Sequence, residues 1–84
     1  MGEVMPMWRY RIRELREDHD LTQRFIASYL SIAQNTYSNY ENGKREIPME
    51  QMIRLADFYK VNMDYLIGRT DEKGMLPPSK RTKL

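Results

Sequence analysis

Amide and hydroxyl side chains gather in a short segment near the middle of the chain. Gln34 and Ser38, like Asn35 and Asn39, are four residues apart, and Asn35 and Ser38 are three apart, which places them on one face of a helix. An Asn or Gln amide can form two hydrogen bonds with an adenine edge, and a hydroxyl can bond several bases. This uncharged face therefore suits the reading of bases in the DNA major groove. A solvated helix face without any partner is the alternative interpretation of the same residues.

The rest of the sequence offers little for catalysis or metal binding. The chain has no cysteine, and its single histidine, His19, stands in an expected turn between Asp18 and Asp20. A thiolate nucleophile and a cysteine-ligated zinc are thereby excluded. The four glycines are far apart, so they form no loop that could cradle a phosphate. We predict that the protein is not an enzyme and has no catalytic residue, cofactor or metal.

Net charge does not by itself indicate a nucleic-acid partner, because the excess lies at one end of the chain. There are 14 Lys and Arg against 12 Asp and Glu, a net charge of +2. Residues 8–68 carry nine basic and nine acidic side chains, whereas Lys80, Arg81 and Lys83 stand within the last six residues. The position of each cation relative to residues 34–39 is therefore more informative than the sum.

The elements that position these side chains are expected to be helices, since apolar residues recur at helical spacing almost throughout. No alternation of apolar and polar residues is long enough to predict a sheet. Short helices joined by turns of three or four residues must cross at steep angles to share one core, so we predict a compact all-α domain of five helices. Their apolar stripes are, in order, Trp8-Ile12-Leu15, Ile26-Ala27-Leu30, Tyr37-Tyr40, Met52-Leu55-Ala56-Tyr59 and Met63–Ile67.

Residues with capping propensity indicate where these helices begin and end. Thr22 and Asn62 suit the N-caps of the second and fifth helices, and Gly68 suits the end of the fifth. Ser31, with Gln34 three residues later, fits a capping box. Because Ala33 is a poor N-cap, this pattern offers an alternative to a turn at residues 31–33, in which the third helix begins two residues early, near Ser31.

The domain is expected to occupy residues 8–68. Residues 1–7 are interpreted as a flexible N-terminal segment and residues 69–84 as a flexible, basic C-terminal tail. The N-terminal sequence MGEVMPMW lacks the basic start and apolar run of a secretory signal, and no apolar stretch approaches the length of a membrane span. We therefore expect a cytoplasmic protein without a membrane partner.

The segment from Leu21 to Gly43 predicts two helices separated by the turn Ser31-Ile32-Ala33, which is a helix-turn-helix. With its flanking motifs, the chain resembles the Cro/phage-repressor (XRE) family of bacterial and phage regulators. The resemblance implies a lambda-repressor-like fold, with the helix-turn-helix at helices 2 and 3 and helix 3 in the major groove. It is carried by IRELRE (12–17), LTQ (21–23), Ala27, YENGKR (40–45) and IPMEQMIRLADFYKVNMDYLIGRT (47–70).

The resemblance assigns roles to individual residues. Gln23 would bind a DNA phosphate and also bond Gln34, holding its amide flat for a base. Arg16 and Glu41 would form a structural ion pair within the fold. Base contacts are expected from Gln34, Asn35, Ser38 and Asn39, and phosphate contacts from Thr22, Gln23, Arg24, Thr36, Asn42, Lys44 and Arg45. For Arg24, simple tolerance in the first turn of its helix is an equally good interpretation. Of the arginines in the first helix, Arg11 is the best placed for the DNA backbone, although a solvated helix face explains all of them.

We expect a sequence-specific transcriptional regulator of double-stranded DNA, acting as a repressor and binding a palindromic operator as a homodimer. The alternative is a protein-interaction module, such as the antitoxin of a toxin–antitoxin pair. A protein partner would then bind at Phe25 and Tyr29, which stand where the family is usually polar, or at the C-terminal helix. Core packing of Phe25 and Tyr29 is the other interpretation.

Overall fold

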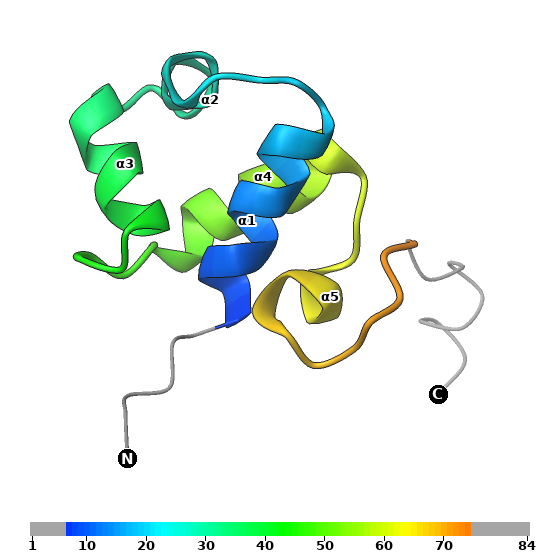
Figure 1. Cartoon of the computed structure of the whole chain (residues 1–84). Coiled ribbons are helices and arrows are strands. Elements are labelled where there is room, and N and C mark those ends of the chain that lie inside the picture. Colours follow the sequence, from blue (N-terminus) through cyan, green and yellow to red (C-terminus); the bar gives the residue numbers. More distant parts are fainter. Residues whose placement is uncertain (1–6, 75–84) are drawn as a thin grey trace.

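Five α-helices follow one another in residues 7–74, the part of the chain that this computed structural model describes (Figure 1). They are α1 (Met7–Asp18), α2 (Gln23–Leu30), α3 (Gln34–Glu41), α4 (Met49–Tyr59) and α5 (Met63–Ile67). Residues 7–74 contain no β-strand, and none of these helices is long and apolar enough to span a membrane. The predicted all-α, five-helix fold is confirmed.

The core is built mainly from the predicted apolar stripes, and Ile47 and Val61 from the connecting segments complete it. α3 packs against both α2 and α1, while α5 packs against α1 and α4. Burial of one large aliphatic side chain stabilises a fold by roughly 1.5–3 kcal/mol, so the stripes hold α3 firmly against α1 and α2. The largest side chains that are fully buried are Tyr37, Ile12, Ile26, Leu30, Leu55 and Leu66.

Two of the helices begin at the capping side chains expected from the sequence. The Thr22 hydroxyl accepts a hydrogen bond from the Phe25 N–H at 3.0 Å, and the side-chain oxygen Oδ1 of Asn62 accepts one from the Tyr65 N–H at 2.6 Å. Gly68 ends α5 with a left-handed φ of 92°, and a Cβ there would lie 2.5 Å from the Cβ of Met7. A side chain at Gly68 would therefore push the ends of α1 and α5 apart.

The expected capping box at Ser31 is wrong. Ser31 has a left-handed φ of 61°, and its N–H donates to carbonyls of the last turn of α2, so this residue ends α2 instead of beginning α3. α3 begins at Gln34, after Ala33, which has no side-chain cap. The short turn requires a sharp change of chain direction at Ser31, and this requirement outweighs the side-chain cap.

Residues 69–74, which we call the C-terminal strap, fold back toward the core after α5 (Figure 1). The N–H of Asn62 donates to the Lys73 carbonyl at 3.0 Å, and its side-chain amide donates to the Glu72 and Gly74 carbonyls at 2.8 and 2.6 Å. The strap is thus bonded to the domain, in contrast to the expected flexibility of residues 69–84. The remaining tail, 75–84, and the expected N-terminal segment up to residue 6 lie outside the described residues.

Arg11 is a structural residue and not part of a solvated face. It is 9% exposed, and its guanidinium donates to the carbonyls of Tyr65 and Thr70 at 3.1 and 3.2 Å and to the Asp71 carboxylate at 2.9 Å. The guanidinium also lies over the Tyr65 ring, 4.0 Å from its centroid. Arg11 joins α1, α5 and the strap, and these bonds leave it unsuited to contact a DNA backbone.

Candidate nucleic-acid interface

The turn between α2 and α3 fixes the angle between these two helices. Ala27, only 2% exposed, allows close approach of the two helices, and its carbonyl accepts a hydrogen bond from the Ile32 N–H at 2.9 Å. Ile32 packs against the core from the turn. The two helices with this turn form the expected helix-turn-helix, and α3 presents its outer face to solvent (Figure 1).

The four residues expected to read bases lie on that outer face. Gln34 and Asn35 are exposed, and Ser38 and Asn39 are half-buried. Gln34, Asn35 and Ser38 line an open hollow of about 330 Å³ together with Gln23 from α2. A surface of amides and one hydroxyl can both donate and accept hydrogen bonds, as base edges require.

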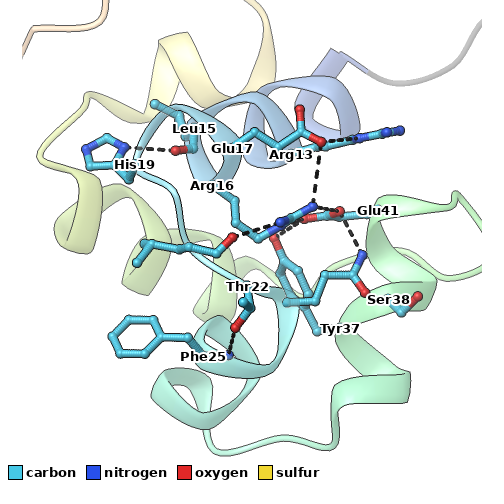
Figure 2. Close-up of polar contacts among 12 residues, drawn as sticks. Arg13, Leu15, Arg16, Glu17, His19, Thr22, Phe25, Tyr37, Ser38 and Glu41 are labelled. Atoms are coloured by element: carbon cyan, nitrogen blue, oxygen red, sulfur yellow. Dashed lines mark hydrogen bonds and ion pairs between the residues drawn. The ribbon is translucent and has the colours of Figure 1, made fainter.

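The only acidic residue of α3, Glu41, is removed from this face by burial. Its side chain is 2% exposed and forms an ion pair with Arg16, whose Nε lies 2.7 Å from Oε2 and whose Nη2 lies 3.0 Å from Oε1. The Tyr37 hydroxyl and the Gln23 amide also donate to this carboxylate, at 2.5 and 2.9 Å. Figure 2 shows α1, α2 and α3 converging on Glu41 through these bonds. The structural pair of Arg16 and Glu41 thus lies at the junction of three helices.

Hydrogen bonding keeps Glu41 ionised inside the protein. Burial by itself would raise the pKa of Glu41, but hydrogen bonds from Arg16, Tyr37 and Gln23 lower that pKa below its ordinary value. Burial, and then the bond to Glu41, raise the pKa of the Tyr37 hydroxyl above its ordinary value, so Tyr37 remains a donor. The charge of Glu41 is balanced by Arg16, and α3 therefore exposes no carboxylate.

The expected bond between Gln23 and Gln34 does not occur among the hydrogen bonds of residues 7–74. The amide nitrogen of Gln23 donates to Glu41 instead. Gln23 and Gln34 nevertheless line the same hollow, so the two side chains share one face of the helix-turn-helix.

The residues expected to contact phosphate lie at the start of α2, within α3 and in the turn that follows α3. Thr22, Arg24, Asn42, Lys44 and Arg45 are exposed, and Thr36 is half-buried. The Thr22 hydroxyl already caps α2, and the Asn42 amide donates to the Ser38 hydroxyl at 3.3 Å. After α3, Gly43 adopts a left-handed φ of 79°, and the N–H groups of Lys44 and Arg45 both donate to the Asn39 carbonyl. This turn holds the two cations close to the end of α3.

An exposed aromatic patch lies on the outer side of α2, away from the core. Phe25 and Tyr29 are 48% and 36% exposed, so they are not core residues. Both rings pack against Phe58 of α4, with centroid distances of 6.2 and 4.7 Å. We call Phe25, Tyr29 and Phe58 the aromatic patch. The membership of Phe58 in this patch is not evident from the sequence. Phe58 directly precedes Tyr59 of the buried stripe and is itself only half-buried.

Arg54 is a further residue whose role the sequence does not reveal. Its guanidinium donates to the carbonyls of Tyr29 and Leu30 at 3.0 and 3.4 Å, and these carbonyls belong to the last two residues of α2. A cation at the negative end of a helix dipole is stabilising. Arg54 lies 24 and 25 residues from these partners in the sequence, so no local spacing could have indicated the contact.

The C-terminal helix contributes mainly to the core. Tyr65 and Leu66 are buried, and Ile67 is half-buried at the edge. His19 stands in the turn after α1, where its ring packs 5.2 Å from that of Tyr59. Within residues 7–74, no three His, Asp or Glu side chains are arranged to hold a metal ion.

Comparisons with known proteins agree with this geometry. The helix-turn-helix family model HTH_3 matches residues 12–66. The chain is 36% identical over 66 residues to the uncharacterised HTH-type transcriptional regulator YobD of Bacillus subtilis, a match that covers 79% of this chain and 59% of YobD. It is 34% identical over 65 residues to the cryptic phage CTXphi transcriptional repressor RstR of Vibrio cholerae, covering 77% of this chain and 59% of RstR.

A solved structure supports the fold independently. A transcriptional regulator from Listeria innocua superposes with a TM-score of 0.73 at 23% identity, covering 93% of this chain and 72% of that one. This likeness concerns the fold alone. The chain spans 59% of the length of YobD and of RstR, so the match covers the helix-turn-helix part of each relative.

Proposed function

The chain belongs to the helix-turn-helix family of Cro/phage-repressor (XRE) type, and from this premise we propose that it is a sequence-specific DNA-binding repressor that reads an operator half-site with α3 in the major groove. The observation that carries the proposal is the outer face of α3. This face presents amide and hydroxyl groups without an exposed carboxylate, because Glu41 is buried. A repressor of this size acts by occupying a site that RNA polymerase needs.

Within this proposal, base reading and backbone binding belong to different residues. Gln34, Asn35, Ser38 and Asn39 contact base edges from α3. Backbone contacts come from the polar and cationic residues around it: Thr22, Gln23, Arg24, Thr36, Asn42, Lys44 and Arg45. Since residues 8–68 have no net charge, non-specific affinity is modest, and base contacts account for much of the preference for one site.

We also propose that two copies bind one operator as a homodimer. One helix-turn-helix reads a few base pairs, and a two-fold dimer places two recognition helices about 34–36 Å apart on one side of the duplex. The operator is then a palindrome with half-sites one helical turn apart. The half-buried edge of α5 at Ile67 is available for such an interface.

A random-sequence binding selection with the full chain, combined with sedimentation of the complex, tests this function. The expected result is a palindrome bound by two copies. Gln34→Ala should then lose discrimination at one base pair of each half-site by roughly 1–3 kcal/mol. Failure of the wild-type chain to enrich any sequence would refute the proposed function. A single half-site bound by one copy would refute the dimer alone.

The aromatic patch favours a second candidate, a protein-binding module of the antitoxin kind with DNA binding as a secondary activity. Large aromatic side chains that are exposed side by side, as Phe25 and Tyr29 are at 48% and 36%, are typical of binding sites. Affinity capture of the product of a neighbouring gene tests it, with Phe25→Ser expected to abolish capture. Met49→Ser is the matched control, since Met49 is also exposed but lies outside the patch. Equal capture by both variants would exclude the patch as the binding site.

A further inference from the structure

We propose that Arg9 of α1 is a positioning residue for DNA-backbone binding, because it holds the turn after α3 that carries Lys44 and Arg45. This inference rests on the proposed function, since it names the residue that fixes two of the proposed phosphate contacts. From the sequence alone, a solvated helix face explains Arg9. In the structure Arg9 is half-buried and bonded to a residue 32 positions away.

The first observation is a hydrogen bond at the end of α3. The last turn of a helix leaves carbonyls without a partner inside the helix. Those of Ser38, Asn39 and Tyr40 accept hydrogen bonds from backbone N–H groups of the turn that follows. The carbonyl of Glu41 accepts its bond from Nη1 of Arg9 at 2.8 Å. Arg9 thus completes the hydrogen bonding at this helix end, where the helix dipole also favours a cation.

The guanidinium of Arg9 also lies against the backbone of the turn itself. Gly43 has a φ of 79°, and a Cβ placed there would lie 3.2 Å from the Arg9 Cδ and 3.5 Å from its Cζ. Lys44 follows directly, and the N–H groups of Lys44 and Arg45 share the Asn39 carbonyl at 2.9 and 3.3 Å. Arg9 therefore restricts the backbone from which two exposed cations project.

The nitrogen atoms of Arg9 are engaged within the protein, which favours positioning over a direct contact with DNA. Nη1 donates to Glu41, Nη2 donates to the Tyr10 hydroxyl at 3.3 Å, and Nε is buried. The ring centroid of Tyr10 lies 4.8 Å from the guanidinium carbon. An arginine held in this way offers little to a phosphate. Lys44, in contrast, binds more tightly from a fixed backbone, because less conformational entropy is lost on binding.

The bond of Arg9 can be removed without disturbing the buried ion pair. Arg16 binds the carboxylate of Glu41, whereas Arg9, seven residues earlier on α1, binds its backbone carbonyl. Loss of the Arg9 guanidinium leaves the charge of Glu41 balanced by Arg16 and hydrogen-bonded by Tyr37. We therefore expect a change that is confined to the turn.

Two variants of the full chain test the inference, with hydrogen exchange of the free protein and DNA affinity as readouts. Arg9→Met keeps the apolar stem and removes the guanidinium, and Arg9→Lys keeps the charge without the planar group that lies on Gly43. Arg13→Met is the matched control, because Arg13 is an exposed arginine of the same helix and its loss changes the net charge equally. Affinities are measured for the operator obtained in the selection and for a mixed-sequence duplex, below the melting temperature of every variant.

We expect Arg9→Met and Arg9→Lys to speed the exchange of the Lys44 and Arg45 amides, while amides within α2 keep their wild-type rates. Both variants should bind both DNAs about three- to tenfold more weakly, which is the scale of one lost phosphate contact at about 0.1 M salt. In a chain that already carries Lys44→Gln and Arg45→Gln, the loss should fall below about twofold, since Arg9 acts through those side chains. Arg13→Met should remain close to wild type in both readouts.

Wild-type affinity in Arg9→Lys would overturn the inference in favour of a direct charge contact. An undiminished loss in the chain with Lys44→Gln and Arg45→Gln would also overturn it, as would wild-type affinity in Arg9→Met or an equal loss in Arg13→Met. These outcomes are distinct from a failure of the proposed function. That failure is already visible in the wild-type chain, which would enrich no sequence at all.

Discussion

At the scale of single residues, the buried position of Glu41 gives it two roles, one in stability and one in the charge of the proposed DNA-binding face. It is the last residue of α3, yet its carboxylate points into the protein and is bonded to side chains from α1, α2 and α3. Burying a charge is unfavourable unless it is paired and hydrogen-bonded, and here Arg16 and Tyr37 meet both conditions. One residue therefore stabilises the helix-turn-helix and removes a negative charge from the proposed DNA-binding face.

Replacement of this residue, Glu41→Gln, should lower the free energy of unfolding at neutral pH by about 3–5 kcal/mol, since Arg16 is left buried without its partner. The native pKa of Glu41 lies below its ordinary value of 4.5, so the ionised carboxylate stabilises the fold above that pH. This contribution is lost as the pH falls through the lowered pKa. The difference between variant and wild type should therefore shrink in acid.

Urea denaturation from pH 7 down to pH 3 measures this difference directly. Glu14→Gln is the control, because Glu14 lies on the same helix as Arg16 but is exposed, and it forms no ion pair within residues 7–74. A difference between Glu41→Gln and wild type that stays constant over this pH range would contradict the role of an ionised Glu41.

Lys44 provides the corresponding prediction on the proposed interface. It is exposed in the turn after α3, and Lys44→Gln should weaken binding to all DNA sequences alike. Loss of one phosphate contact reduces the slope of log affinity against log salt by about one. Binding titrations at several salt concentrations measure the slope, and Lys60→Gln, an exposed lysine between α4 and α5, is the control. Identical slopes for Lys44→Gln and wild type would exclude a phosphate contact at this residue.

At the scale of the elements, local sequence signals were informative wherever one side chain determines a boundary. Thr22, Asn62 and Gly68 begin or end helices as predicted, since capping depends on neighbouring backbone groups. The start of α3 was not predictable in this way, because the angle between α2 and α3 forces Ser31 into the left-handed conformation. The same limit applies to Arg54 and Phe58, whose partners on α2 are distant in sequence.

The missing cap of α3 leads to a prediction for this element. Ala33 occupies the N-cap with extended backbone angles, φ −69° and ψ 147°, which a capping serine also adopts. Ala33→Ser should therefore raise the free energy of unfolding by about 1 kcal/mol, because its hydroxyl can accept from a free N–H of the first turn. Thermal or urea denaturation measures the change. Ala33→Val, which offers no acceptor, should give no gain, and equal stabilisation by both variants would argue against a capping effect.

At the scale of the whole molecule, the strap alters the interpretation of the charged end of the chain. The domain itself is electrically balanced, and the basic residues Lys80, Arg81 and Lys83 lie beyond residue 74, outside the described part. Asn62 holds the strap against α5, and the strap lies on the opposite side of the molecule from α3 (Figure 1). The basic residues thus follow a fixed point that is remote from the proposed DNA-binding face. Composition alone could not have indicated this, because it depends on hydrogen bonds between Asn62 and residues 10 to 12 positions further along the chain.

Asn62 allows the strap to be released without removing the cap of α5. Its side-chain oxygen Oδ1 accepts from the Tyr65 N–H, while its side-chain nitrogen Nδ2 donates to the Glu72 and Gly74 carbonyls. Asn62→Asp keeps an acceptor for the cap and replaces the donor with an oxygen that repels both carbonyls. The strap should detach, and the N–H of residue 62, which donates to the Lys73 carbonyl, should lose its protection from hydrogen exchange. Amides in α2 and α3 should exchange at the wild-type rate, since neither helix contacts the strap through these bonds.

Asn62→Ala, which removes the cap as well, should in addition expose the first amides of α5 to exchange. If Asn62→Asp left the protection of residue 62 from exchange unchanged, the side-chain amide of Asn62 would not be what holds the strap. The strap would then be held by the bonds of Arg11 to Thr70 and Asp71 instead.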